Sequence, residues 1–135
     1  MPVSERDHMR QVFFDAWKKH QNRALLEPLE AQIMTIMMQH PEYHALFNRQ
    51  ENLTQDFQDQ NPFVHMSLHL AVQEQIATDR PPGIKAVYAK FCVKLQDTHL
   101  VEHQMMECLA SVLWHAQMTG KMPDEREYLE KLRIL

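Results

Sequence analysis

The chain has 135 residues, the size of one ordinary domain, and it can bury a core without disulfides or a structural metal. Hydrophobic residues make up 44% and charged residues 24%, with a net charge of −4, which excludes a disordered chain and gives no basic patch for nucleic acid. No apolar stretch reaches membrane-spanning length and no signal-peptide core follows the charged start, so we expect no membrane partner and a cytoplasmic location.

The first half of the chain predicts two amphipathic helices and a loop. Apolar residues recur at intervals of three and four in residues 5–20, which is the period of one helix face. A second helix is expected over residues 25–39, with Pro28 in its first turn, where a missing N–H costs nothing. A short helical turn follows in residues 41–47. The polar stretch 48–60 has no period and is predicted to be a loop.

The second half predicts three longer helices and a short terminal one, at residues 62–78, 83–96, 98–118 and 124–132. Asn61 as N-cap and Pro62 at the first helical position mark the start of the first of them. Asp97 or Thr98 is expected to cap the third, and Gly120 to end it. The chain holds only two glycines and shows no strand pattern. These features predict an all-α protein: a single-domain bundle of about five helices, mainly up-down, with a short C-terminal helix.

Nine histidines are many for a chain of this length, and two groups of them have helical spacing. His65 and His69 lie 40° apart on helix 62–78, at about 100° per residue, on the side that carries most of its apolar residues. His99, His103 and Glu107 repeat at intervals of four on helix 98–118, also beside apolar residues. Both groups are therefore predicted to face inward.

A bundle with an up-down-up path would bring these two groups together. The helices that carry them would then run parallel, so four imidazoles and one carboxylate would meet at one end. The positive end of a helix dipole favours neutral imidazole, the metal-binding form, at His65 and His99. Such a donor set suits zinc, iron, nickel or copper better than magnesium or calcium. We therefore predict a metal site, with zinc or iron as the expected ion, for storage, sensing or hydrolysis by metal-bound water.

The alternative interpretation is a structural or protein-interaction module whose inward histidines only satisfy hydrogen bonds in the core. A protein partner or a homo-oligomer is compatible with it. His40 and His44, on either side of Pro41, are expected to be exposed to solvent, and His8, His20 and His115 to lie at the surface.

Two further side chains of helix 98–118 are expected in the core. Trp114 has the spacing of a core residue, and Cys108 is expected to be a small buried side chain. Neither the cysteines nor the serines have the surroundings of a catalytic nucleophile.

Three stretches of the sequence resemble an uncharacterised bacterial family, domain of unknown function 1841. They read "NPFVHMSLHLAVQEQIATDRPPGI", "HLVEHQMMECLASVLWHAQ" and "PDEREYLEKLR", and they cover most of the chain from Asn61 onward. The resemblance implies a small cytoplasmic helical protein and carries no established activity. It implies that His65, His69, His99 or its neighbour, and His103 occupy the motif histidine positions and that Glu107 occupies the motif acid. An acidic residue often stands at the position of His115, which argues against an essential role for that histidine.

Overall fold

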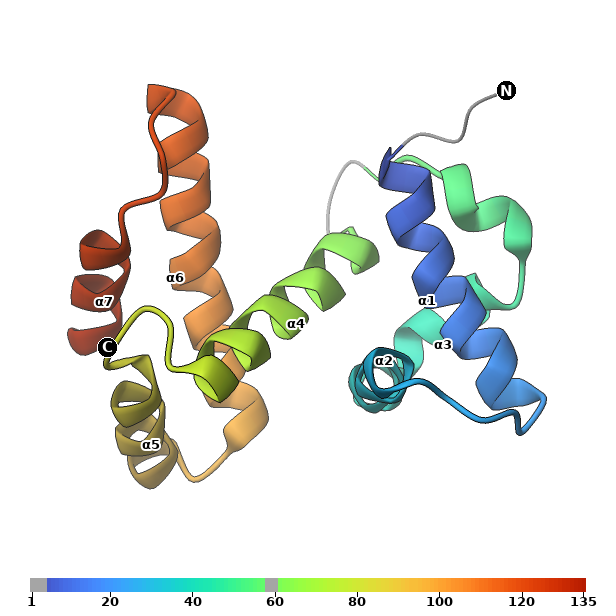
Figure 1. Cartoon of the computed structure of the whole chain (residues 1–135), viewed down its shortest axis with the longest axis horizontal. Helices are drawn as coiled ribbons and strands as arrows, with labels where there is room; N and C mark the ends of the chain where they lie inside the picture. The colour runs from blue at the N-terminus through green and yellow to red at the C-terminus, as the bar shows by residue number, and fades with distance from the viewer. Residues whose placement is uncertain (1–4, 58–60) are drawn as a thin grey trace. The chain divides into compact units, whose positions relative to one another are not determined.

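The computed structural model describes residues 5–57 and 61–135. Within these ranges the chain forms seven α-helices, two short 3-10 helices and no strand, which confirms the predicted all-α class (Figure 1). It does not form the predicted single five-helix bundle, because it divides into two compact units, residues 1–67 and 68–135. None of its described helices has both the length and the apolar character that a membrane crossing requires.

The described residues of unit 1 form three α-helices, two 3-10 helices and the beginning of a fourth α-helix. In chain order these are α1 (Glu5–Gln21), α2 (Pro28–Met38), η1 (Pro41–Tyr43), α3 (His44–Phe47), η2 (Gln50–Thr54) and α4 (Pro62–Thr78). The helix η2 lies within the stretch 48–60 that was predicted to be a loop, and residues 58–60 fall outside the described ranges. The side-chain oxygen of Asn61 accepts the backbone N–H of Phe63 at 2.9 Å, which confirms Asn61 as the cap of α4.

The core of unit 1 is built around aromatic rings from α1, α3 and α4. Phe14 and Phe47 meet edge to face with ring centroids 5.0 Å apart, and Phe63 packs against both. Arg10 is buried beside this cluster, where its guanidinium donates to the carbonyls of Leu53 at 3.1 Å and Gln55 at 2.7 Å. These two bonds tie the end of η2 and the residue that follows it to α1.

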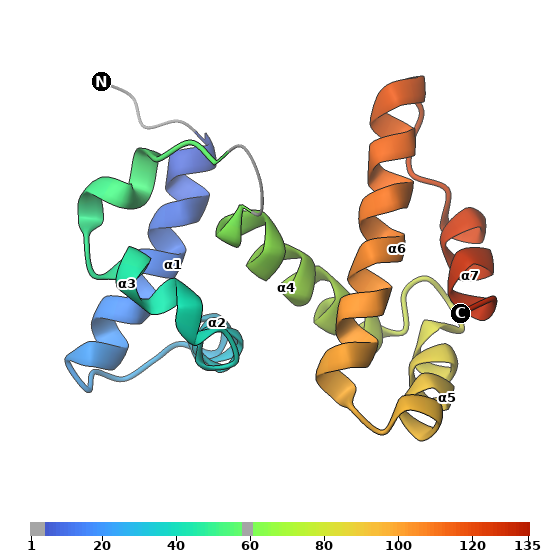
Figure 2. The same ribbon diagram turned by 180° about the vertical axis from the view of Figure 1, so that it is seen from behind.

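Unit 2 contains the second half of α4 and three further helices. These are α5 (Ile84–Leu95), α6 (Thr98–Thr119) and α7 (Glu125–Arg133). The helices α5 and α7 both pack against α6, and α6 and α7 lie side by side in both views (Figure 1 and Figure 2). Asp97 caps α6 by accepting the N–H groups of His99 and Leu100, and Gly120 ends it with a left-handed φ of 69°. The predicted caps are therefore confirmed.

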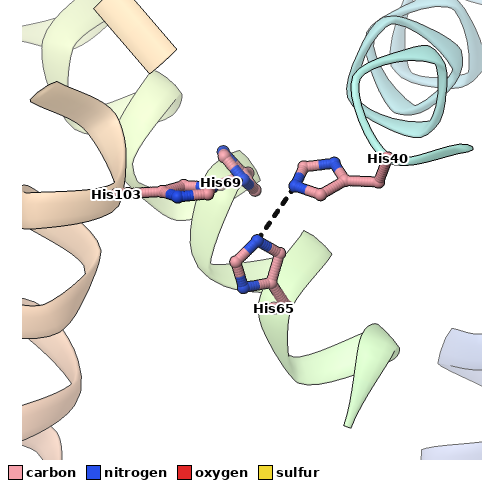
Figure 3. Close-up of side chains that lie close together, drawn as sticks. All are labelled: His40, His65, His69 and His103. Carbon is pink, nitrogen blue, oxygen red and sulfur yellow. Dashed lines mark hydrogen bonds between the residues drawn. The ribbon is translucent and has the colours of Figure 1, made fainter. Parts of the chain in front are cut away.

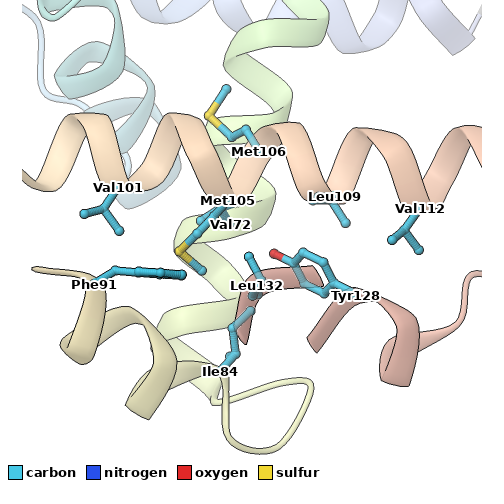
Figure 4. Packing of buried hydrophobic residues seen from close by; sticks show 10 residues of the cluster. All are labelled: Val72, Ile84, Phe91, Val101, Met105, Met106, Leu109, Val112, Tyr128 and Leu132. Carbon is cyan, nitrogen blue, oxygen red and sulfur yellow. The ribbon is translucent and has the colours of Figure 1, made fainter. Parts of the chain in front are cut away.

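One stripe of α6 forms the centre of the core of unit 2. Val101, Met105, Leu109 and Val112 lie on this stripe and pack with residues from α4, α5 and α7, among them Leu132, which is fully buried (Figure 4). In the same view α4 crosses α6 instead of running alongside it. The predicted parallel arrangement is therefore wrong, and contact between these two helices is confined to the crossing.

Replacing the cap of α6 tests how much local hydrogen bonding contributes to unit 2. We expect Asp97→Ala to lower the free energy of unfolding by about 1 kcal/mol, because two backbone N–H groups lose their acceptor. Urea unfolding followed by circular dichroism measures this. The matched control is Glu74→Ala at an exposed position on α4, where a change within about 0.5 kcal/mol is expected. Equal losses in both variants would contradict the assigned cap.

The carboxylate of Glu30 gives unit 1 a pH-dependent contribution to stability. It accepts the N–H of Glu27 at 2.8 Å and binds the ammonium of Lys19 at 2.9 Å, and these bonds, in that order, lower the pKa of Glu30 below its usual 4.5. Folding therefore favours the ionised carboxyl. The resulting stability is present above pH 4.5 and is lost as the pH falls through the lowered pKa.

We expect Glu30→Gln to be less stable than wild type at pH 7, and the difference to shrink as the solution is acidified below pH 4.5. Urea midpoints at a series of pH values measure this. The exposed Glu42 supplies the control Glu42→Gln, which should differ little from wild type at any of them. A difference for Glu30→Gln that stays constant with pH would rule out the titration of this carboxyl as the cause.

Candidate functional site

Three of the predicted histidines come together in unit 2 where α4 crosses α6. His69 on α4 is fully buried, and its Nε2 lies 3.1 Å from the Nε2 of His103 on α6. The ring of His99, one turn before His103, lies 4.1 Å from the ring of His103 and 5.2 Å from that of His69, measured between centroids. Of the five side chains predicted to meet, the structure brings these three together in unit 2.

The acid at this cluster is Glu102. Its Oε1 lies 2.7 Å from the Nδ1 of His69 and also accepts the side-chain amide of Gln73 at 2.8 Å. A carboxylate oxygen only accepts, so the Nδ1 of His69 carries the hydrogen, and the lone pair of the neutral ring is then on Nε2. Glu102 therefore fixes which nitrogen of His69 faces His103.

Glu107 was predicted to face inward with these histidines, and that prediction is wrong because Glu107 is exposed. Each step of four residues turns a helix by about 40°, so the series that starts at His99 rotates away from the buried stripe before it reaches Glu107. Trp114 is 63% exposed, so the core position that its spacing predicted is wrong. Glu102 lies three residues after His99, and residues three apart are also neighbours on a helix surface. The prediction considered only acids at intervals of four residues and therefore missed Glu102.

A second pair of imidazoles lies in unit 1. His40 follows α2 and His65 lies on α4, and their Nε2 atoms are 3.0 Å apart (Figure 3). The Nδ1 of His40 donates to the carbonyl of Ile36 at 2.8 Å, and Tyr43 stacks on its ring at 5.3 Å. His40 is only 4% exposed, so its predicted solvent exposure is wrong. The position of His40 in the sequence could have indicated its burial, since a histidine near the C-terminus of a helix can hydrogen-bond one of the last carbonyls of that helix.

The remaining histidines lie apart from these pairs. His44 is half-buried, with its Nε2 2.8 Å from the carbonyl of Met37 and its ring against Trp17, so its predicted exposure is also wrong. His8 and His20 are exposed, as predicted. His115 is exposed as well, and its Nδ1 lies 3.2 Å from a carboxylate oxygen of Glu127.

Other reactive groups of unit 2 offer little chemistry. Cys92 and Cys108 are free thiols, and burial raises the pKa of Cys108, which disfavours the nucleophilic thiolate. An open pocket of about 620 Å³ lies between α5 and the end of α7. It is lined by apolar residues with Lys90, Lys94 and Arg133, and neither a histidine nor a carboxylate side chain lines it.

The contact between Glu102 and His69 makes a stability prediction. We expect Glu102→Ala to lower the free energy of unfolding by about 1–3 kcal/mol, because it leaves a buried imidazole N–H without its acceptor. Glu107→Ala on the exposed side of the same helix is the control and should change it by less than about 0.5 kcal/mol. Thermal and urea unfolding measure both. Similar losses at the two positions would mean that Glu102 does not hold His69.

Comparison with known proteins identifies a family and no characterised relative. No curated protein and no solved structure matches the chain. The model of the family described as domain of unknown function DUF1841 matches residues 5–134. The sequence motifs showed this resemblance only from Asn61 onward, so the match extends it to unit 1. The match covers nearly the whole chain, and both imidazole pairs lie inside it. The chain therefore belongs to the DUF1841 family.

Proposed function

We propose that this protein binds a divalent transition-metal ion, zinc or iron, through His69 and His103. The observation that carries the proposal is the 3.1 Å separation of their Nε2 atoms. Two imidazoles on one tetrahedral ion, with bonds of about 2.0–2.1 Å, hold their ligand nitrogens about 3.3 Å apart. The two side chains therefore need to move by only a few tenths of an ångström to accept an ion.

The environment of His69 supports the same assignment. Histidine ligands usually donate their second N–H to a carboxylate or a carbonyl, which fixes the tautomer and makes the ligand nitrogen more basic. Glu102 accepts this hydrogen from the Nδ1 of His69 at 2.7 Å. Glu102 thus acts on the ion through His69, as an orienting group and not as a ligand.

The rest of the coordination shell has a candidate in His99. Its ring lies 4.1 Å from that of His103, so a change of rotamer would bring a third imidazole to the same ion. Nitrogen-rich sites suit zinc, copper, nickel and iron. A position left to water would allow hydrolysis by metal-bound water, and a closed shell would suit storage or sensing.

A structural role for the histidines is the second candidate function, and one observation favours it. Every buried side-chain nitrogen and oxygen of the described residues has a hydrogen-bond partner without any ion. An N–H at the Nε2 of His103, donated to His69, satisfies this pair alone. In that case the cluster would serve to hold α4 on α6, and added metal would change nothing.

Metal titration separates these two functions. We expect untagged protein to bind Zn²⁺ and to unfold at a higher temperature with it, because an ion that binds only the folded state stabilises it by mass action. His103→Ala should weaken Zn²⁺ binding strongly, since it removes a ligand, and Glu102→Gln should weaken it by about 10–100-fold through His69. Calorimetric titration gives the affinities, and elemental analysis gives the metal bound per chain.

Three variants serve as controls. His20→Ala and His115→Ala remove exposed histidines and should bind Zn²⁺ like wild type. Cys108→Ser tests whether the Cys108 thiol, one of the two free thiols, is a ligand. Circular dichroism confirms that each variant is folded before its affinity is compared. Absence of binding by wild type after loading with Zn²⁺ and Fe²⁺, or equal binding by His103→Ala and His20→Ala, would refute the proposed function.

A further inference from the structure

We infer that His40 and His65 of unit 1 are also metal ligands, an inference that rests on the proposed metal-binding function. The inference is based on a second close approach of two imidazole nitrogens, with the Nε2 atoms of His40 and His65 3.0 Å apart. This is again within a few tenths of an ångström of the separation of about 3.3 Å that two nitrogens adopt on a tetrahedral ion. Spacing had placed His65 in the candidate site, whereas His40 was expected in solvent.

The tautomer of His40 is fixed as a ligand requires. Its Nδ1 lies 2.8 Å from the carbonyl oxygen of Ile36, which can only accept, so Nδ1 carries the hydrogen. The lone pair of the neutral ring is then at Nε2, the atom that faces His65. A backbone carbonyl here fills the orienting role that Glu102 fills for His69.

Packing holds the His40 ring in this orientation. The ring is 4% exposed, and Tyr43 stacks on it with an interplanar angle of only 6°. The ring of His65 meets it at 79°, so the two nitrogens approach through the edge of one ring and do not stack. Metals bind imidazole through the nitrogen lone pair at the ring edge, and in the neutral ring of His40 that nitrogen is Nε2. His65 is half-buried, which leaves an ion a route from solvent.

His44 shows what an ordinary structural histidine of the same unit looks like. It is also half-buried, and its Nε2 is likewise close to a carbonyl, that of Met37 at 2.8 Å. Its ring packs against Trp17, and its Nε2 faces a backbone carbonyl instead of a second imidazole. His44 therefore provides a control variant from the same unit that matches His65 in burial and His40 in its contact with a backbone carbonyl.

The test compares Zn²⁺ affinity, by calorimetric titration of the full chain, among His40→Ala, His65→Ala, His44→Ala and wild type. We expect the first two to weaken Zn²⁺ binding at the unit 1 pair by at least about tenfold, because each removes a ligand nitrogen there, and His44→Ala to bind like wild type. Long-range ¹H–¹⁵N NMR of the wild-type histidines provides a readout that does not depend on any variant folding. The Nε2 signals of His40 and His65 should shift on addition of Zn²⁺, and those of His44 should not.

The outcomes separate this inference from the proposed function. If folded His65→Ala retains wild-type affinity, or the Nε2 signals of His40 and His65 stay in place while His103→Ala loses binding, then this inference fails and the proposed function stands. If His44→Ala loses as much affinity as His65→Ala, the losses are structural and the inference fails. If wild type binds no Zn²⁺, the proposed function fails and the inference fails with it.

Discussion

The hydrogen bond between His69 and Glu102 is the contact on which the candidate site depends. A fully buried imidazole without an acceptor for its N–H would cost about 1–3 kcal/mol, so His69 can face the core only because Glu102 meets it there at 2.7 Å. The same bond holds α4 to the first turns of α6 and sets the tautomer of His69. One hydrogen bond therefore contributes to the packing of α4 on α6 and also places the lone pair of His69 on Nε2.

The buried histidines of the two units have the same hydrogen-bonding arrangement. In each, a buried histidine gives its Nδ1–H to an oxygen, from a carboxylate at His69 and from a carbonyl at His40, and turns its Nε2 toward another imidazole. Without an ion, the second imidazole donates a hydrogen across this gap. To hold an ion, that ring would instead carry its hydrogen on Nδ1, which would leave the lone pair of its Nε2 facing the metal. Each imidazole pair would therefore have its nitrogens satisfied both with an ion and without one. Such a pair can serve as metal ligands without destabilising the protein when no metal is bound.

The helices themselves were largely predictable, because their boundaries depend on contacts between residues close in sequence. Asn61, Asp97 and Gly120 act within a turn of their own positions, and each does in the structure what its residue type predicts. The assembly of the helices was not predictable in the same way. Steric and apolar matching across α6 decides that α4 crosses it, and no local pattern in either helix encodes that angle.

By itself, the sequence determined an all-α chain and the inward position of His69. These follow from helical period and apolar neighbours, which are local properties. Only the tertiary structure decided that Glu102 and not Glu107 is the acid, because the direction of the buried stripe on α6 depends on what packs against it. Only the tertiary structure placed His40 beside His65, because the contact joins residues 25 positions apart and depends on how the chain turns after α2.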